Sequence, residues 1–149
     1  SNLDATPPVP ENTFNVHGRL RIAYFDCTQS GAGDAGSSFE IVRLPPGKVR
    51  VLAHLSYLEA ASVAASQTID IGWDAYTDLA GDAVALDVDG ILNGGDVDTT
   101  ANINMANVAT IVAGTIAFES QGGVSIRATF IGALVDAETL RGAIVYVQD

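Results

Sequence analysis

The stretch KVRVLAHLSYL at residues 48–58 decides the fold class of this chain. Its odd-numbered positions, from Val49 to Tyr57, are all apolar. Its even-numbered positions begin with the charged Lys48 and Arg50 and then become mixed. Because side chains on a β-strand point alternately to its two faces, this spacing predicts one long strand with a continuously buried face.

Six further stretches have strand character, and turn signals separate several of them. They are residues 20–25, 37–44, 67–73, 108–118, 124–131 and 143–147. Pro45-Pro46-Gly47 and Gln121-Gly122-Gly123 supply tight turns between neighbours. Long amphipathic helix patterns are absent, and only short helical turns are expected, at 59–65, 88–93 and 136–140. The sequence therefore predicts a mainly β fold, an antiparallel β-sandwich or jelly-roll-like single domain over residues 19–149.

The stretches 124–131 and 143–147 carry apolar residues on both of their faces. In the second of them, Ala143, Val145 and Val147 alternate with residues that are also apolar. A strand of this kind is either sandwiched between layers or covered by another subunit.

Length and composition limit the class of protein. A chain of 149 residues fits one domain, and a hydrophobic content of 48% argues against disorder. The formal net charge of −11 disfavours both nucleic acid and an anionic membrane as partners. The single cysteine, Cys27, cannot form an intramolecular disulfide and is expected to be a buried, unreactive thiol. Since neither a signal peptide nor a membrane span is recognisable, synthesis in the cytoplasm is expected.

The charges are distributed unevenly along the chain. Between Val51 and Ile126 there is no lysine or arginine, and this span holds ten acids, eight of them between Asp70 and Asp98. The asymmetry predicts two distinct surfaces, an anionic one facing solvent and a cationic one facing a partner. The cations proposed for contact with that partner are Arg19, Arg21, Arg43, Lys48 and Arg50. Residues 74–107 are expected to form a long acidic connection, which is either functional or carries structure of its own.

Residues 1–18 are predicted to form an extended N-terminal arm. The sequence PPVP at 7–10 forbids a helix and favours a polyproline-like path, and Phe14 is a candidate anchor near the end of the arm. Two interpretations stay open: a terminus without fixed contacts, and an arm that lies along a neighbouring subunit. The second makes contact residues of Pro7, Pro8, Val9, Pro10 and Phe14.

Acidic pairs suggest a calcium site as an alternative to a solvated acidic loop. The weak candidate ligands are Asp87, Asp89, Asp96 and Asp98. Their spacing departs from that of an EF-hand loop, since Gly90 comes at the fourth position and a glutamate is missing at the twelfth. A solvated loop is the favoured interpretation.

Other motifs give little support to a chemical function. GAGDAG at 31–36 matches a dinucleotide-binding pattern, but the sequence after it reads as a strand, so a plain loop is expected. Trp73 and Tyr76 fit either sugar stacking or an ordinary core position, and the second is favoured. Catalytic constellations and sets of metal-ligating histidines are not recognisable. We therefore predict neither enzymatic activity nor a cofactor.

Three segments resemble a group of small head proteins of tailed bacteriophages. They are GKVRVL at 47–52, QTIDIGWDAYTD at 67–78 and the acidic GILNGGDVDTTA at 90–101. In that group a long strand leads to a second strand reading T-[IL]-D-[IV]-G, after which come an acidic segment and closing strands. The likeness covers roughly residues 41–147 and identifies no specific member.

The resemblance implies a capsid decoration, or cement, protein. Such proteins are β-rich, often trimeric and without enzymatic activity, and they clamp neighbouring major capsid proteins on the outer surface of the virion. The alternative is a carbohydrate- or calcium-binding β-sandwich module of a phage fibre or adhesin.

Overall fold

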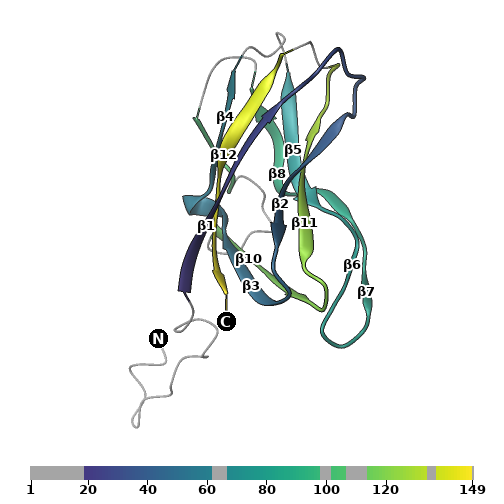
Figure 1. The fold of residues 1–149 in the computed structure, drawn as a ribbon, viewed down its shortest axis with the longest axis vertical. Coiled ribbons are helices and arrows are strands. Elements are labelled where there is room, and N and C mark those ends of the chain that lie inside the picture. The colour runs from purple at the N-terminus through teal and green to yellow at the C-terminus, as the bar shows by residue number, and fades with distance from the viewer. Residues whose placement is uncertain (1–18, 62–66, 98–101, 107–113, 134–136, 149) are drawn as a thin grey trace.

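Two antiparallel sheets pack face to face in the computed structural model, which describes residues 19–61, 67–97, 102–106, 114–133 and 137–148 (Figure 1). The six-stranded sheet has the order β10-β3-β12-β4-β9, and β1 also pairs with β12. Its strands are β1 (Arg19–Thr28), β3 (Gly47–Leu52), β4 (Tyr57–Ala61), β9 (Asn102–Asn104), β10 (Thr115–Ser120) and β12 (Thr139–Gln148). This arrangement is the predicted antiparallel β-sandwich.

The second layer is a four-stranded sheet of order β2-β11-β5-β8. Its strands are β2 (Ser38–Leu44), β5 (Thr68–Trp73), β8 (Asp87–Asp96) and β11 (Val124–Phe130). A small hairpin of β6 (Tyr76–Thr77) and β7 (Ala83–Val84) extends from it. The predicted arm at 1–18 lies outside the described residues.

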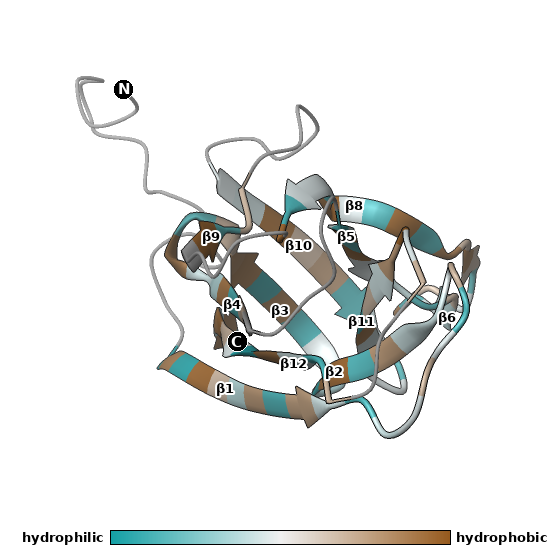
Figure 2. Cartoon of the chain, turned by 90° about the horizontal axis from the view of Figure 1, so that it is seen from above, coloured by the Kyte–Doolittle hydropathy of each residue, from teal (hydrophilic) through white to brown (hydrophobic). Residues whose placement is uncertain are grey.

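The hydrophobic core lies between the two sheets and takes large side chains from both. Phe118 on β10 and Phe130 on β11 are among its fully buried residues. The ring of Trp73 on β5 meets Phe118 edge to face, with 5.3 Å between the ring centroids, and so links the layers directly. Figure 2 shows the underlying pattern, in which hydrophobic and hydrophilic residues alternate along strands such as β1 and β3.

The stretch 48–58 does not form the single strand that its alternation predicts. A 3₁₀ turn at Ala53–Leu55, labelled η2, divides it into β3 and β4. Both pieces pair with the same edge of β12, β4 with its first half and β3 with its last residues. The interruption lets the chain change its outer neighbour, because β3 pairs onward with β10 whereas β4 pairs with β9.

The acidic segment 74–107 carries structure of its own, since β6, β7, β8 and β9 all lie in it. The helical turn expected at 88–93 is wrong, because these residues belong to β8. Two irregularities in the β5–β8 pairing leave β8 with extra residues, so its strict alternation is lost. Ile91 and Leu92 are consecutive and both fully buried, a pattern that imitates a helix.

The other two expected helical turns, at 59–65 and 136–140, overlap strands in the structure. Residues 59–61 complete β4, and residues 139–140 begin β12. Residues 62–66 and 136 lie outside the described part, as do residues 108–113 of the stretch predicted to end in β10.

Candidate binding surface

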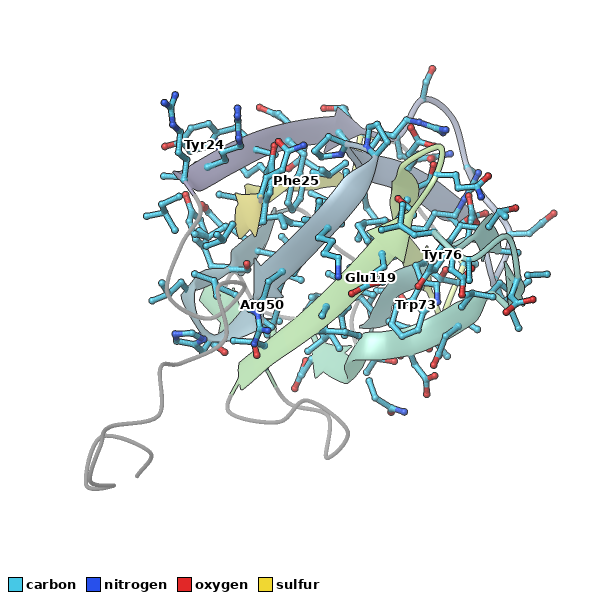
Figure 3. The ribbon with its side chains drawn as sticks, turned by 90° about the horizontal axis from the view of Figure 1, so that it is seen from below. Tyr24, Phe25, Arg50, Trp73, Tyr76 and Glu119 are labelled. Carbon is cyan, nitrogen blue, oxygen red and sulfur yellow. The ribbon has the colours of Figure 1, made fainter. Side chains whose placement is uncertain are left out.

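The outer face of β1 exposes three large apolar side chains. Leu20, Ile22 and Tyr24 are 61%, 50% and 75% exposed, whereas Phe25 is only 7% exposed. The even-numbered positions of β1 therefore point away from the core. Figure 3 shows the difference, with Tyr24 on the outer side of the β1 ribbon and Phe25 on its inner side. Exposed apolar side chains in a row are typical of a surface that binds a partner.

Apolar residues of the neighbouring strands widen this row. Leu20, Ile22 and Tyr24 pair with Val147, Val145 and Ala143 on β12. Ala143 pairs on its other side with Tyr57 of β4, which is 43% exposed. We call the seven residues Leu20, Ile22, Tyr24, Tyr57, Ala143, Val145 and Val147 the apolar outer face. Ala143 and Val145 are covered by their neighbours, with 1% and 8% exposure, so the larger side chains of Leu20, Ile22, Tyr24 and Tyr57 form its exposed part. The apolar outer face explains why the sequence from 143 to 147 is apolar on both faces: one face meets the core and the other belongs to this surface.

A groove lies between the two tyrosines of the apolar outer face. Its volume is about 360 Å³, and its lining consists of Tyr24, Phe25, Asp26, Tyr57, Glu59, Arg141 and Gly142. We call it the tyrosine groove. The ion pair between Arg141 Nη2 and Glu59 Oε1, at 3.3 Å, supplies its charged part.

Gly142, at the bottom of the tyrosine groove, allows close packing on the inner side of β12. A Cβ atom at this position would lie 2.2 Å from the carbonyl oxygen of Tyr57 and 2.8 Å from the ring of Phe25. Real Cβ atoms do not approach other atoms so closely, so β4 and β1 can pack against β12 at this point only because the residue is glycine.

The formal charges of the two sheets have opposite signs. The strands of the six-stranded sheet carry five cations and three acids, a formal charge of +2: Arg19, Arg21, Lys48, Arg50 and Arg141 against Asp26, Glu59 and Glu119. The strands of the four-stranded sheet carry two cations and five acids, a formal charge of −3: Arg43 and Arg127 against Glu40, Asp70, Asp87, Asp89 and Asp96. Residues 74–84 around the β6–β7 hairpin add three more aspartates. The apolar outer face thus belongs to the less acidic layer.

The structure separates the five cations that sequence reasoning grouped together. Arg19 and Arg21 are exposed on β1, but their odd positions alternate with the apolar row. Lys48 pairs with Glu119 at 2.9 Å, and the half-buried Arg50 sits opposite Val147 of the apolar outer face.

Arg43 belongs to the other sheet. It donates to Ser125 Oγ at 3.1 Å and to the carbonyl of Gly122 at 3.2 Å. The five cations therefore do not form one patch. The proposed arm contacts Pro7, Pro8, Val9, Pro10 and Phe14 lie outside the described residues.

A second hollow, of about 520 Å³, lies beside Arg43 and is lined mainly by polar groups, among them Asp74 and Tyr76. Arg127 donates to Asp74 Oδ2 at 2.8 Å, and this hydrogen bond raises the pKa of the guanidinium further above its already high ordinary value. Burial, with nearby Asp78 and Glu119, raises the pKa of the Tyr76 hydroxyl, so the phenol stays neutral near pH 7. Arg127 and Asp74 thus form a structural ion pair beside this hollow.

The acidic candidates for calcium binding do not converge. Asp87 pairs with Trp73 and Asp96 with Thr68, five residues away on β5, which corresponds to about 17 Å of strand. Asp89 accepts a hydrogen bond from the Asn93 side chain. Within the described ranges, no group of three or more His, Cys, Asp or Glu side chains is placed to hold a metal ion. Asp98 lies outside those ranges.

Trp73 is engaged within the protein. Its ring packs on Phe118, and its Nε1–H donates to the carbonyl of Ala85 at 3.2 Å. The ring also lies where a side chain at Gly90 would be, because a Cβ there would come within 2.2 Å of it. The sequence favours such a packed position for Trp73 over a role in stacking on a sugar. Tyr76 joins the same aromatic cluster through Phe118.

The apolar outer face was missed at the level of sequence, although a signal for it exists. Residues 20–25 alternate Leu20, Ile22 and Tyr24 with Ala23 and Phe25, so both faces of this strand are apolar. The same signal was noted for residues 143–147. What the sequence does not show is that β1 and β12 pair along ten residues and so combine their outer rows.

Comparisons with known proteins identify a fold shared with a viral capsid. No family model matches the chain, and no curated protein matches it. A chain of the solved structure "Cyanophage Pam1 capsid asymmetric unit" superposes with a TM-score of 0.56 at 13% identity, and the match covers 100% of this chain and 97% of that one. At this identity the likeness shows the fold alone.

Two structures of infectious bursal disease virus match more weakly. The Gt strain gives a TM-score of 0.33 at 12% identity, and the VP2 subviral particle gives 0.27 at 10%. They cover 87% and 88% of this chain but 42% of their own chains, and these scores are too low to carry an argument. No helix in the described part is long and apolar enough to cross a membrane.

Proposed function

We propose that this protein is a structural component of a phage virion, a decoration or cement protein that binds the outside of the head and clamps neighbouring major capsid proteins. The observation that carries the proposal is the cyanophage capsid likeness. It extends over essentially the whole of both chains, so the two have nearly the same length and architecture. The likeness therefore concerns the whole of this fold and not one part of it. The resemblance of residues 47–52, 67–78 and 90–101 to small phage head proteins points the same way.

The apolar outer face supports a role in assembly. Among the described residues, nine large hydrophobic side chains are exposed, and five of them lie on the six-stranded sheet or on η2, namely Leu20, Ile22, Tyr24, Leu55 and Tyr57. Covering such residues with a partner removes apolar surface from water, which stabilises a complex by roughly 25 cal/mol for each Å². The proposal makes this face a contact with the shell or with another copy.

The distribution of charge supports an orientation. The acidic four-stranded sheet and its hairpin suit exposure to solvent, where negative charge favours solubility and disfavours non-specific association. The six-stranded sheet, with its formal +2, suits contact with the major capsid protein. Neither nucleic acid nor a membrane is proposed as a partner.

The mechanism is adhesion without chemistry. A homo-oligomer, proposed to be a trimer, would touch several capsid subunits at once, so that each contact after the first forms at a high effective concentration. Weak individual contacts then add up to slow dissociation, and the shell resists rupture. The protein would be made in the host cytoplasm and would act on the outer surface of the virion.

Binding to phage heads tests the proposal. Purified protein is mixed with heads that lack it, and co-sedimentation and cryo-EM of the particles are compared. We expect saturable binding and density at regular positions on the outer surface of the capsid. Intact virions without any copy of the protein, together with heads that do not bind it, would reject the proposal.

A further inference from the structure

We propose that the tyrosine groove is the receptor for the proline-rich segment Pro7–Pro10 of a neighbouring copy of this chain. The inference rests on the proposed homo-oligomeric function and deepens it, since it names the surface and the ligand that join two copies. It follows from the shape of the groove, the chemistry of its walls and the length of the chain that precedes β1.

The groove has the dimensions of a slot for a small ring. Tyr24 and Tyr57 both pair with Ala143, from opposite sides, so the two tyrosines stand on the same face with one strand between them. Two strand spacings put their Cα atoms about 10 Å apart. Ala143 itself is covered, with only 1% of it exposed, and the groove of about 360 Å³ is completed beside it by Phe25, Asp26, Glu59, Arg141 and Gly142.

Paired aromatic walls over a shallow floor are the surface that binds polyproline segments. A proline-rich strand exposes pyrrolidine rings at regular intervals and is already extended, so docking costs it little conformational entropy. The tyrosine hydroxyls at the rim are also suited to donate to the carbonyl groups of the ligand, which a polyproline helix leaves without internal partners.

This chain contains one segment of matching chemistry, PPVP at residues 7–10. Glu11 follows it directly, and Arg141 lies in the lining of the groove with about half of its side chain exposed. Asp26 and Glu59 also line the groove, and Glu59 already pairs with Arg141, so charge does not select the occupant. The segment is selected by its pyrrolidine rings, which match the two tyrosine rings of the groove.

The length of the arm allows it to leave its own subunit. Eight residues separate Pro10 from Arg19, so nine Cα–Cα steps span about 30 Å of extended chain. The groove of the same subunit lies about 17 Å along β1, so this length reaches either the chain's own groove or that of a second subunit. The proposal commits to the neighbouring copy because an exchanged segment joins the subunits of the proposed homo-oligomer.

Photo-cross-linking of the full-length protein tests the assignment. Val9 is replaced by the photoreactive p-benzoylphenylalanine, and this chain is mixed with a heavy-isotope copy that has Val9 intact. After irradiation, mass spectrometry identifies the cross-linked peptides. We expect links from position 9 to the peptides that contain Tyr24 or Tyr57, joining light chains to heavy ones.

Substitutions in the groove test whether the two tyrosines hold the proline-rich segment. The double substitution Tyr24→Ala and Tyr57→Ala should reduce the yield of these links about tenfold, since aromatic anchors dominate interfaces of this kind. Leu86→Ala, at an exposed apolar residue outside the apolar outer face, should leave the yield unchanged. Circular dichroism verifies that each variant keeps the fold.

Three outcomes would overturn the assignment: links within single chains only, links to another surface, or a yield that ignores the tyrosine substitutions. Binding to phage heads is measured separately on the same variants. Heads that bind the protein while the links fall elsewhere would reject the groove and leave the decoration function standing. Links in the groove without binding to heads would support the groove as the receptor and reject the decoration function.

Discussion

One buried hydroxyl completes the hydrogen bonding of β12 where its neighbouring strand is interrupted. Ser56 lies between η2 and β4 and is fully buried. Its Oγ accepts a hydrogen bond from the backbone N–H of Val145 at 3.0 Å and donates to the carbonyl of Leu52 at 3.0 Å. The side chain takes over a bond that an unbroken ladder would have provided.

Replacing Ser56 with alanine should therefore destabilise the protein. The N–H of Val145 would remain buried without its acceptor, which costs about 1–3 kcal/mol. The free energy of unfolding, measured by urea denaturation, should fall by this amount. Ser37→Ala is the matched control, because its Oγ makes an exposed hydrogen bond to Asp34 and its loss should cost little. Equal stability of the two variants would contradict the role assigned to Ser56.

The thiol of Cys27 should react slowly. Burial, and to a smaller extent the neighbouring Asp26, raises its pKa above the ordinary value. Since the thiolate is the reactive form, alkylation by iodoacetamide at pH 8 should be slower in the folded protein than in urea, and it should accelerate as the pH rises further.

The Asp26→Asn variant checks the electrostatic part of this effect. Removing a negative charge stabilises the thiolate and lowers the pKa, so the reaction rate at pH 8 should increase modestly. A folded protein that reacts faster than the unfolded chain at the same pH would show that the pKa is lowered instead.

At the scale of elements, the start of β8 passes so close to β5 that only glycine fits at residue 72. A Cβ at Gly72 on β5 would lie 1.8 Å from the carbonyl oxygen of Asp87. The bulged start of β8 thus passes directly over β5 at this point. This pairing holds β8, the acidic edge strand, on the four-stranded sheet.

Gly72→Ala should accordingly disrupt the β5–β8 pairing. The cost should exceed the roughly 1–3 kcal/mol of ordinary overpacking, because backbone and not a movable side chain is in the way. Thermal denaturation and amide exchange of β8 measure it. Gly122→Ala, where a Cβ would meet no atom within 4 Å, should keep wild-type stability. An unchanged β8 exchange pattern in Gly72→Ala would contradict this close approach.

The strands also show how far the alternation of apolar and polar residues predicts secondary structure. The regular burial pattern of β3 follows from its sequence period, because a two-residue repeat of apolar residues corresponds directly to two faces. The break at Ala53–Leu55 and the bulges of β8 depend on partners far away in the chain, and they disturb the period where they occur. The helical turn expected at 88–93 failed for this reason.

The same limit applies to the candidate site. The sequence identified strands that are apolar on both faces, which is a local property. It did not place Tyr24 and Tyr57 on either side of Ala143, because that requires the register of three strands. Arg43 and Lys48 show the same limit: they are five residues apart in the sequence, yet their strands belong to different sheets.

At the scale of the whole molecule, the apolar outer face should drive self-association. Ile22→Ser places a hydroxyl in the middle of this face, and we expect the oligomer to dissociate at micromolar concentration in sedimentation-velocity experiments. Because Ile22 is half exposed, the stability of the monomer should change little. Leu86→Ser, an equally exposed change elsewhere, should sediment as wild type. Identical oligomers in all three proteins would exclude this face from the subunit contact.

The pairing of Arg19 with Gln148 has a practical consequence for protein engineering. Since the start of β1 and the end of β12 are partners, a peptide joined after Gln148 would emerge beside the start of β1. The loop between β1 and β2, which contains the exposed Gly31, lies at the opposite end of the molecule from the start of β1 (Figure 1). Antigen display on particles would therefore use an insertion at this glycine-rich loop, remote from the start of β1 and the end of β12.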